Sequence, residues 1–89
     1  MALSESQRNR IAQLKIRMQS IRKDIDNLKQ RKKHISERYA GLIKSTKNAI
    51  QKRNYRQSKI SETNSVVNEI SRKRQEIENI KRDIASIKN

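Results

Sequence analysis

The chain has 89 residues, of which 23 are lysine or arginine and 9 are aspartate or glutamate, so its formal net charge is +14. It contains no cysteine, proline, tryptophan or phenylalanine and only one glycine, which excludes disulfides, thiolate metal sites, cysteine nucleophiles and glycine-rich phosphate loops. Apolar residues make up 31% of the chain and form no long run, so we expect neither a membrane span nor a secretory signal.

The same composition indicates the fold class. A β-rich domain needs turn residues about every 8–12 positions, and one glycine without any proline cannot supply them. High charge with low apolar content also fits intrinsic disorder. A disordered chain, however, has no reason to keep the regular apolar spacing described next. The sequence therefore predicts an all-α protein with a single helical domain over residues 1–89.

We expect the first helix over about residues 4–44. Ser4 and Gln7 form a capping-box sequence, which is typical of a helix start. Apolar residues then recur in alternating steps of three and four, the a/d pattern of a coiled coil, with Lys32 as the interruption. These seam positions are Ile11, Leu14, Met18, Ile21, Ile25, Leu28, Ile35, Tyr39 and Leu42.

We expect the second helix over about residues 54–88, with the same spacing and Lys73 as its interruption. Its seam positions are Thr63, Val66, Ile70, Ile77, Ile80, Ile84 and Ile87. The two seams match if the chain folds back so that paired residue numbers sum to about 98, because each interrupting lysine then faces an apolar residue and can extend its stem along it. This register predicts an antiparallel two-helix coiled-coil hairpin.

The position of the turn is the harder prediction. The register places it at about residues 45–53, whereas Gly41 is a rival site because glycine commonly follows a helix end. One long continuous helix is a further alternative, because one seven-residue column stays apolar from Leu14 to Ala49 and again from Ile70 onward. We favour the hairpin, because the companion column changes sides and residues 44–59 offer few apolar positions for packing.

A lone two-helix hairpin has little core, and apolar side chains flank its seam. These flanking positions are Ile16, Ile43, Ile50, Ile60 and Val67. Such width suits a three- or four-helix assembly, so we expect a helical protein partner that binds through the seam in a hetero-oligomer. A partner with acidic side chains would relieve the repulsion of the +14 charge, which self-association would double.

The charge is concentrated in the middle of the chain. Residues 29–59 hold eleven basic residues and one acidic residue, Glu37. We expect this stretch to dock to an anionic partner, through Arg31, Lys32, Lys33, Arg38, Lys52, Arg53 and Arg56. The anion could be an acidic protein, a nucleic acid or a lipid surface, and a basic nucleic-acid-binding protein is the alternative function.

No catalytic, cofactor-binding or metal-ligating set is visible in the sequence. His34 has no second histidine near it, and Asp24 and Asp26 do not face each other on a helix. Two tyrosines are too few for a base-stacking platform. We therefore expect a non-enzymatic protein without cofactors.

Tyr39-Ala40-Gly41, an aromatic-x-Gly motif near the middle of a small helical hairpin, resembles the Trp-x-Gly family of type VII secretion, and more closely the helical accessory partners of its toxins. Tyrosine replaces tryptophan here, and Lys59 stands where a downstream aromatic-x-x-x-acid signal would end, four residues after Tyr55. The resemblance implies an adaptor or targeting chaperone that binds the helical domain of a larger secreted protein. It implies a cytoplasmic location and allows co-export with that partner.

Overall fold

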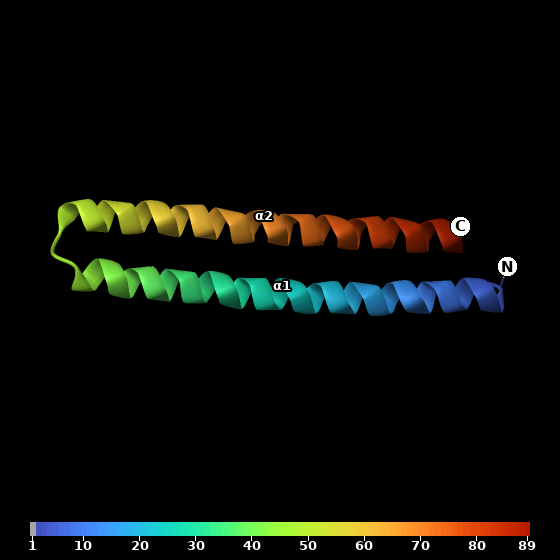
Figure 1. The fold of residues 1–89 in the computed structure, drawn as a ribbon. Coiled ribbons are helices and arrows are strands. Elements are labelled where there is room, and N and C mark those ends of the chain that lie inside the picture. The colour runs from blue at the N-terminus through green and yellow to red at the C-terminus, as the bar shows by residue number, and fades with distance from the viewer. Residues whose placement is uncertain (1) are drawn as a thin grey trace.

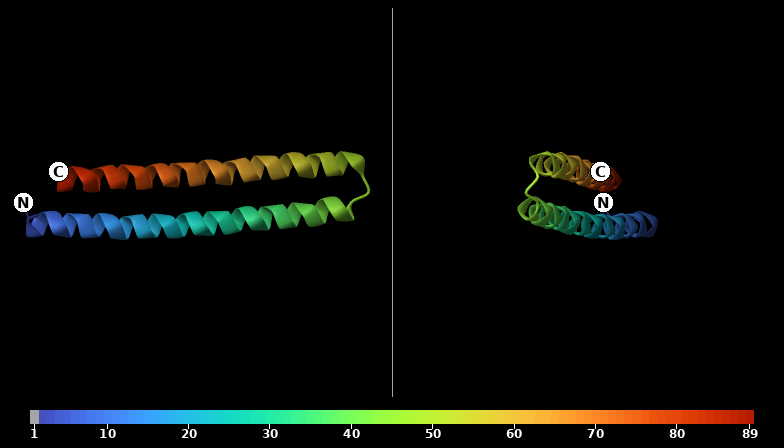
Figure 2. Two further views of the ribbon diagram at one scale, coloured as in Figure 1. Left: turned by 180° about the vertical axis from the view of Figure 1, so that it is seen from behind. Right: turned by 60° about the vertical axis from the view of Figure 1, so that its left-hand side comes forward.

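The computed structural model describes residues 2–89 as two long antiparallel helices joined by a short turn (Figures 1 and 2). Helix α1 spans Glu5–Ser45 and helix α2 spans Ala49–Lys88. The hairpin measures 69 × 15 × 12 Å, and both chain termini lie at the end opposite the turn. Both helices exceed the roughly 20 residues that can cross a bilayer, but neither contains a sufficiently apolar segment within the described residues.

The start of α1 follows from its local sequence. The Ser4 backbone N–H donates to Oε1 of Gln7 at 2.8 Å, and the Gln7 backbone N–H donates to Oγ of Ser4 at 3.1 Å. These two bonds complete the predicted capping box, which satisfies backbone donors that have no partner in the first helical turn. Glu5 follows directly, and its negative charge suits the positive end of the helix dipole.

The turn is shorter than predicted. It consists of residues 46–48, so α2 begins at Ala49, five residues before the expected start near residue 54. Asn48 explains the early start, because its Oδ1 accepts from the backbone N–H groups of Ile50 at 2.9 Å and Gln51 at 3.2 Å. Thr46 strengthens the turn by donating its hydroxyl to Oε1 of Gln51 at 2.7 Å.

Both alternatives to this turn are wrong. The reversal at residues 46–48 excludes the continuous helix, and Gly41 lies inside α1, four residues before its end. Gly41 has no positive φ angle, and a Cβ built on it meets nothing within 4 Å. A turn at residue 41 would have forfeited the helical packing of Leu42, which is partly buried.

The core is a single line of apolar side chains between the helices. The buried cluster consists of Ile11, Leu14, Met18, Ile21, Ile25 and Leu28 from α1 and Val66, Ile70, Ile77, Ile80 and Ile84 from α2. Leu14 and Val66 are the most enclosed, each with 2% of its surface exposed. This cluster occupies the two thirds of the hairpin farthest from the turn, and Leu3, Ile35 and Ile87 pack against it.

Replacement of Leu14 by alanine tests this core. A fully buried leucine truncated to alanine costs about 2–5 kcal/mol, which is a large share of the stability of so small a domain. We expect the helical circular dichroism signal of Leu14→Ala to be lost at a much lower urea concentration than that of the wild type. The neighbouring exposed Gln13→Ala is the control, with an expected change within about 0.5 kcal/mol. Equal midpoints for the two variants would contradict the assigned core.

Replacement of Gly41 by alanine tests the position of the turn. Because Gly41 is helical and has free space around its Cα, alanine should stabilise the hairpin by about 0.5–1 kcal/mol. Urea unfolding followed by circular dichroism measures this gain. Destabilisation would instead indicate a left-handed glycine and a turn at residue 41.

Candidate partner-binding surfaces

The predicted seam is occupied by the chain itself. Of its α1 members, Ile11, Leu14, Met18, Ile21, Ile25, Leu28 and Tyr39 are buried, as are Ile70, Ile77, Ile80 and Ile84 of α2. Ile35, Leu42 and Ile87 are partly buried. While the hairpin is closed, a partner cannot reach these side chains. The surfaces that remain for binding are the two edges and the two outer faces of the hairpin.

Near the turn, lysine and tyrosine side chains occupy several positions of the seam. The side chains of Lys52 and Lys59 are partly buried, at α2 seam positions that lie close to the turn. Tyr39 is buried here beside Tyr55, with ring centroids 6.4 Å apart and ring planes inclined by 53°. Arg38 adds its guanidinium 5.5 Å from the centre of the Tyr39 ring, within the range of a cation–π contact. An aromatic pair thus replaces the aliphatic layers at this end.

At this end one polar group lacks a partner and a second has a shifted pKa. The hydroxyl of Thr63 is buried without a hydrogen-bond partner among the described residues. Hydrogen bonding with the Glu62 carboxylate raises the pKa of Tyr39 above its ordinary value of 10.0, and burial raises it further. Both causes favour the neutral phenol, because a phenolate would repel Glu62 and lose its hydration.

The predicted anion-docking residues do not form one patch. Arg31, Lys32, Lys33, Arg38, Arg53 and Arg56 are exposed, and Lys52 is partly buried. The ion pair of Asp24 with Lys73 places Arg53 opposite about residue 44, so at 1.5 Å per residue Lys32 and Arg53 lie about 18 Å apart along the hairpin axis. Arg31 lines a groove with Glu69, so an acidic residue of the chain already faces part of this set.

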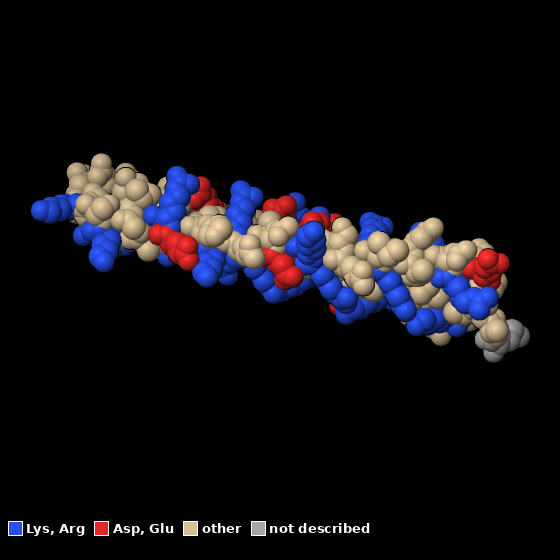
Figure 3. Space-filling view, turned by 90° about the horizontal axis from the view of Figure 1, so that it is seen from below, with Lys and Arg blue, Asp and Glu red and all other residues tan. Residues whose placement is uncertain are grey.

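The acidic residues nonetheless leave the turn end free. No aspartate or glutamate occurs between Glu37 and Glu62, the stretch that contains the turn. The turn end, at the left of Figure 3, accordingly shows lysine and arginine beside uncharged residues without acidic ones on the visible face. Cationic character at this end is therefore a property of the folded surface as well as of the sequence.

Heptad positions reveal how the charges are divided between the two edges. With seam residues at a and d, the e positions of both helices fall on one edge, because the helices run in opposite directions. We call it the basic edge, and its members are Arg8, Lys15, Arg22, Lys29, Ser36 and Ile43 of α1 and Arg53, Ile60, Val67, Arg74, Lys81 and Lys88 of α2. It thus holds eight basic residues, three apolar residues, one serine and no acidic residue.

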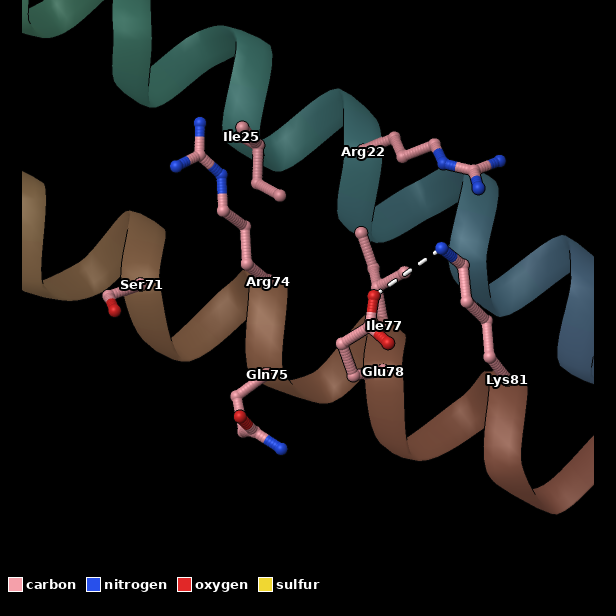
Figure 4. A pocket seen from close by; sticks show the side chains of 8 residues that line it. All are labelled: Arg22, Ile25, Ser71, Arg74, Gln75, Ile77, Glu78 and Lys81. Atoms are coloured by element: carbon pink, nitrogen blue, oxygen red, sulfur yellow. Dashed lines mark hydrogen bonds and ion pairs between the residues drawn. The ribbon is translucent and has the colours of Figure 1, made fainter.

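Grooves along the hairpin confirm this grouping. Arg22 of α1 shares a groove with Arg74 and Lys81 of α2, as Figure 4 shows. Lys15 shares a second groove with Lys88, and Ile43 shares a third with Ile60. The e positions of the two helices therefore face common surface along the length of the molecule.

The opposite edge is neutralised by the chain itself. We call it the paired edge, and it consists of the g positions Arg10, Arg17, Asp24, Arg31, Arg38 and Ser45 of α1 and Tyr55, Glu62, Glu69, Glu76 and Asp83 of α2. Four arginines thus share this edge with five carboxylates. The Asp24 carboxylate also forms an ion pair with the Lys73 ammonium at 3.7 Å, close to the predicted placement of that lysine opposite Ile25.

Four large apolar side chains stay exposed on the closed hairpin. Ile50 has 71% of its surface exposed, Ile16 66%, Ile60 60% and Val67 41%. Ile60 and Val67 lie one heptad apart on the basic edge, close to Ile43, whereas Ile16 lies on the outer face of α1. The apolar positions that flank the seam are therefore not equivalent, and one edge collects three of them.

The net charge of successive chain segments does not reveal the basic edge, because its members are spread from Arg8 to Lys88. Heptad letters assigned to the charged residues could have found it. Residues 2–89 contain no group of three or more histidine, cysteine, aspartate or glutamate side chains that could hold a metal ion. No protein-family model, no curated protein and no solved structure matches this chain.

The environment of Tyr39 predicts its ionisation. In Tyr55→Phe protein, Tyr39 is the only tyrosine, and its phenolate absorbance should appear with a midpoint above pH 10.0. Because the unfolded phenol ionises first, this contribution to stability is present below pH 10.0 and is lost as the pH rises above it. Adding Glu62→Gln should lower the midpoint, whereas Glu37→Gln on the outer face of α1 should not. Equal midpoints in both backgrounds would contradict the contact with Glu62.

Proposed function

We propose that this protein is a non-enzymatic helical adaptor, a targeting chaperone that binds the helical domain of a larger, secreted protein. The observation that carries the proposal is the exposure of Ile50, Ile60 and Val67 on a hairpin whose own seam is already filled. A partner helix that packs on these exposed apolar side chains removes them from water, which lowers the free energy of the assembly. The partner therefore adds one or two helices to the hairpin.

The charge supports an acidic partner. At +14, a second copy would bring together two strongly positive surfaces, whereas a helix rich in aspartate and glutamate lowers the electrostatic free energy of the assembly. Dispersed surface charges of this kind chiefly accelerate the encounter of two partners. The adaptor and its partner thus form a hetero-oligomer.

Secretion enters the proposal through the resemblance of Tyr39-Ala40-Gly41 to type VII accessory partners. This motif occupies the last turns of α1, where Tyr39 packs against Tyr55. In this proposal the hairpin covers the apolar face of its partner in the cytoplasm and presents it for export, with or without accompanying it.

Binding to nucleic acid is the second candidate, supported by the absence of acidic residues between Glu37 and Glu62. The predicted docking residues, however, lie on several faces, and the exposed isoleucines offer nothing to a phosphate. Under the adaptor proposal, binding to duplex DNA at physiological salt is weak and nonspecific, with Kd of about 10⁻⁴–10⁻⁶ M. A sequence-selective Kd near about 10⁻⁸ M would favour the nucleic-acid function instead.

Co-purification from the native host tests the adaptor proposal. We expect the tagged chain to retain one helical, acidic protein in stoichiometric amount after nuclease treatment, and the purified complex to melt at a higher temperature than the chain alone. Mass spectrometry identifies the partner, and circular dichroism measures the melting.

A matched variant sharpens this experiment. Ile50→Ser together with Ile60→Ser should release the partner, because both changes remove exposed apolar surface without touching the core. Ser58→Ala, a change at an exposed residue of α2, is the control and should retain it. The proposal would be overturned if nucleic acid were recovered in place of a stoichiometric protein. It would also be overturned if the chain had the same melting temperature with and without its partner.

A further inference from the structure

The two edges of the hairpin differ in the balance of basic and acidic residues. On the paired edge, five carboxylates of the same chain offset the formal charge of four arginines, and among the described residues Asp24 pairs with Lys73 rather than with an arginine. On the basic edge, eight basic residues have no acidic counterpart at any e position. A self-contained hairpin has no need of this asymmetry, because alternating charges on both edges would serve its stability better.

The charged side chains in one groove of the basic edge are incompletely paired within the chain. In the groove of Figure 4, Glu78 comes in from a neighbouring position and pairs with Lys81 at 3.4 Å. Arg22 and Arg74 line the same groove from opposite helices, and neither has a carboxylate of residues 2–89 within 4.0 Å. The two guanidinium groups point to opposite sides of this groove, and Glu78, which pairs with Lys81, is the only acidic residue among those that line it.

The edge also offers apolar contacts near the turn end. Ile43 and Ile60 line a groove together with Thr63, whose buried hydroxyl lacks a partner, and with the cationic residues Arg56 and Lys59. Val67 continues this apolar surface one heptad after Ile60. Because a heptad advances about 10.5 Å along a helix, the edge repeats with the period that another helix lying beside it would have.

From this arrangement we infer that the basic edge is the docking surface for an acidic amphipathic helix, which lies along the groove between the e positions and completes a three-helix bundle. Its apolar residues cover Ile43, Ile60 and Val67, and its carboxylates meet Arg22, Arg74 and Lys81. This inference rests on the proposed adaptor function and adds which surface binds and what chemistry it selects.

Other occupants fit the edge less well. A nucleic acid would neutralise the cations but leave Ile60 and Val67 uncovered, since phosphates gain nothing from isoleucine or valine. A second copy meeting edge to edge would bring sixteen basic side chains together, eight from each chain. Only a helix that carries both carboxylates and apolar side chains satisfies both features of the surface.

A synthetic helix provides the probe. It contains about four heptads, the length over which a heptad pattern becomes a reliable coiled coil, with isoleucine and leucine at a and d and glutamate at e and g. The control peptide carries lysine in place of glutamate. We expect the full hairpin to bind the acidic peptide as a one-to-one complex with increased helicity, and to show no binding of the lysine peptide.

Matched charge reversals locate the contact. Arg22→Glu with Arg74→Glu reverses two residues of the basic edge, whereas Lys23→Glu with Arg82→Glu makes the same change of net charge on the outer faces. Because each reversal turns an attraction into a repulsion, the edge variant should bind the acidic peptide at least about tenfold more weakly than the outer-face variant. Circular dichroism of each free variant verifies that the hairpin persists.

Replacement of exposed isoleucines by serine tests the apolar part of the contact. Ile60→Ser should weaken binding at least about fivefold, because it removes apolar surface that the peptide covers. Ile16→Ser removes an equally exposed isoleucine from the outer face of α1 and should leave binding unchanged. Sedimentation of the hairpin alone and with peptide distinguishes the one-to-one complex from self-association.

Several results would overturn the inference. Equal loss of binding in the two charge-reversed variants would show that net charge alone attracts the peptide. Duplex DNA binding that is tighter than peptide binding and lost only in the edge variant would assign the edge to nucleic acid. Dimerisation of the hairpin through the same residues would assign it to a second copy.

The experiments can reject the adaptor function and the assignment of the basic edge independently of each other. If the native partner is captured equally by wild type and by Arg22→Glu with Arg74→Glu, the adaptor function stands and the basic edge is rejected as its surface. If no native partner is captured although peptide binding depends on the edge, the edge stands and the adaptor function is rejected.

Discussion

Burial of one apolar seam between two antiparallel helices is the interaction on which the structure depends. With only two helices, each seam residue is covered from one side, so the buried cluster is a line rather than a volume. The free energy of this line must offset the ordering of 81 helical residues. Little is left over for stability, and any partner that covers further apolar surface adds a large fraction of the total.

The seam also determines what the charged residues can do. Once a and d positions face each other, e positions share one edge and g positions share the other. The acidic g residues of α2, such as Glu69, then lie beside arginines of α1, such as Arg31. The acidic residues of the chain are few, and the fold places four of them along one side of α2. Basic residues therefore accumulate on the opposite edge, where Lys81 pairs with Glu78 but no e position is acidic.

The turn end is held together differently from the rest. Partly buried lysines and the Tyr39–Tyr55 pair replace the aliphatic layers, and among the described residues Thr63 has a buried hydroxyl without a hydrogen-bond partner. Fewer apolar contacts mean that this end opens at lower free-energy cost than the core around Leu14. It also carries Ile50 and Ile60, which are exposed. The more loosely packed end of the hairpin thus carries two of the four large apolar side chains that are exposed among the described residues.

The sequence alone determined the helices, the seam and the antiparallel pairing, because capping boxes and three-four spacing act over a few residues and are visible in the chain itself. The sequence placed the turn within the correct range, residues 45–53, but made it too long, because the Asn48 side chain starts α2 five residues early through two local hydrogen bonds that periodicity does not reveal. Only the tertiary structure decided that Arg22 and Arg74, 52 positions apart, share one groove. Edges exist only once two helices are paired, so the charge of an edge is a property of the fold.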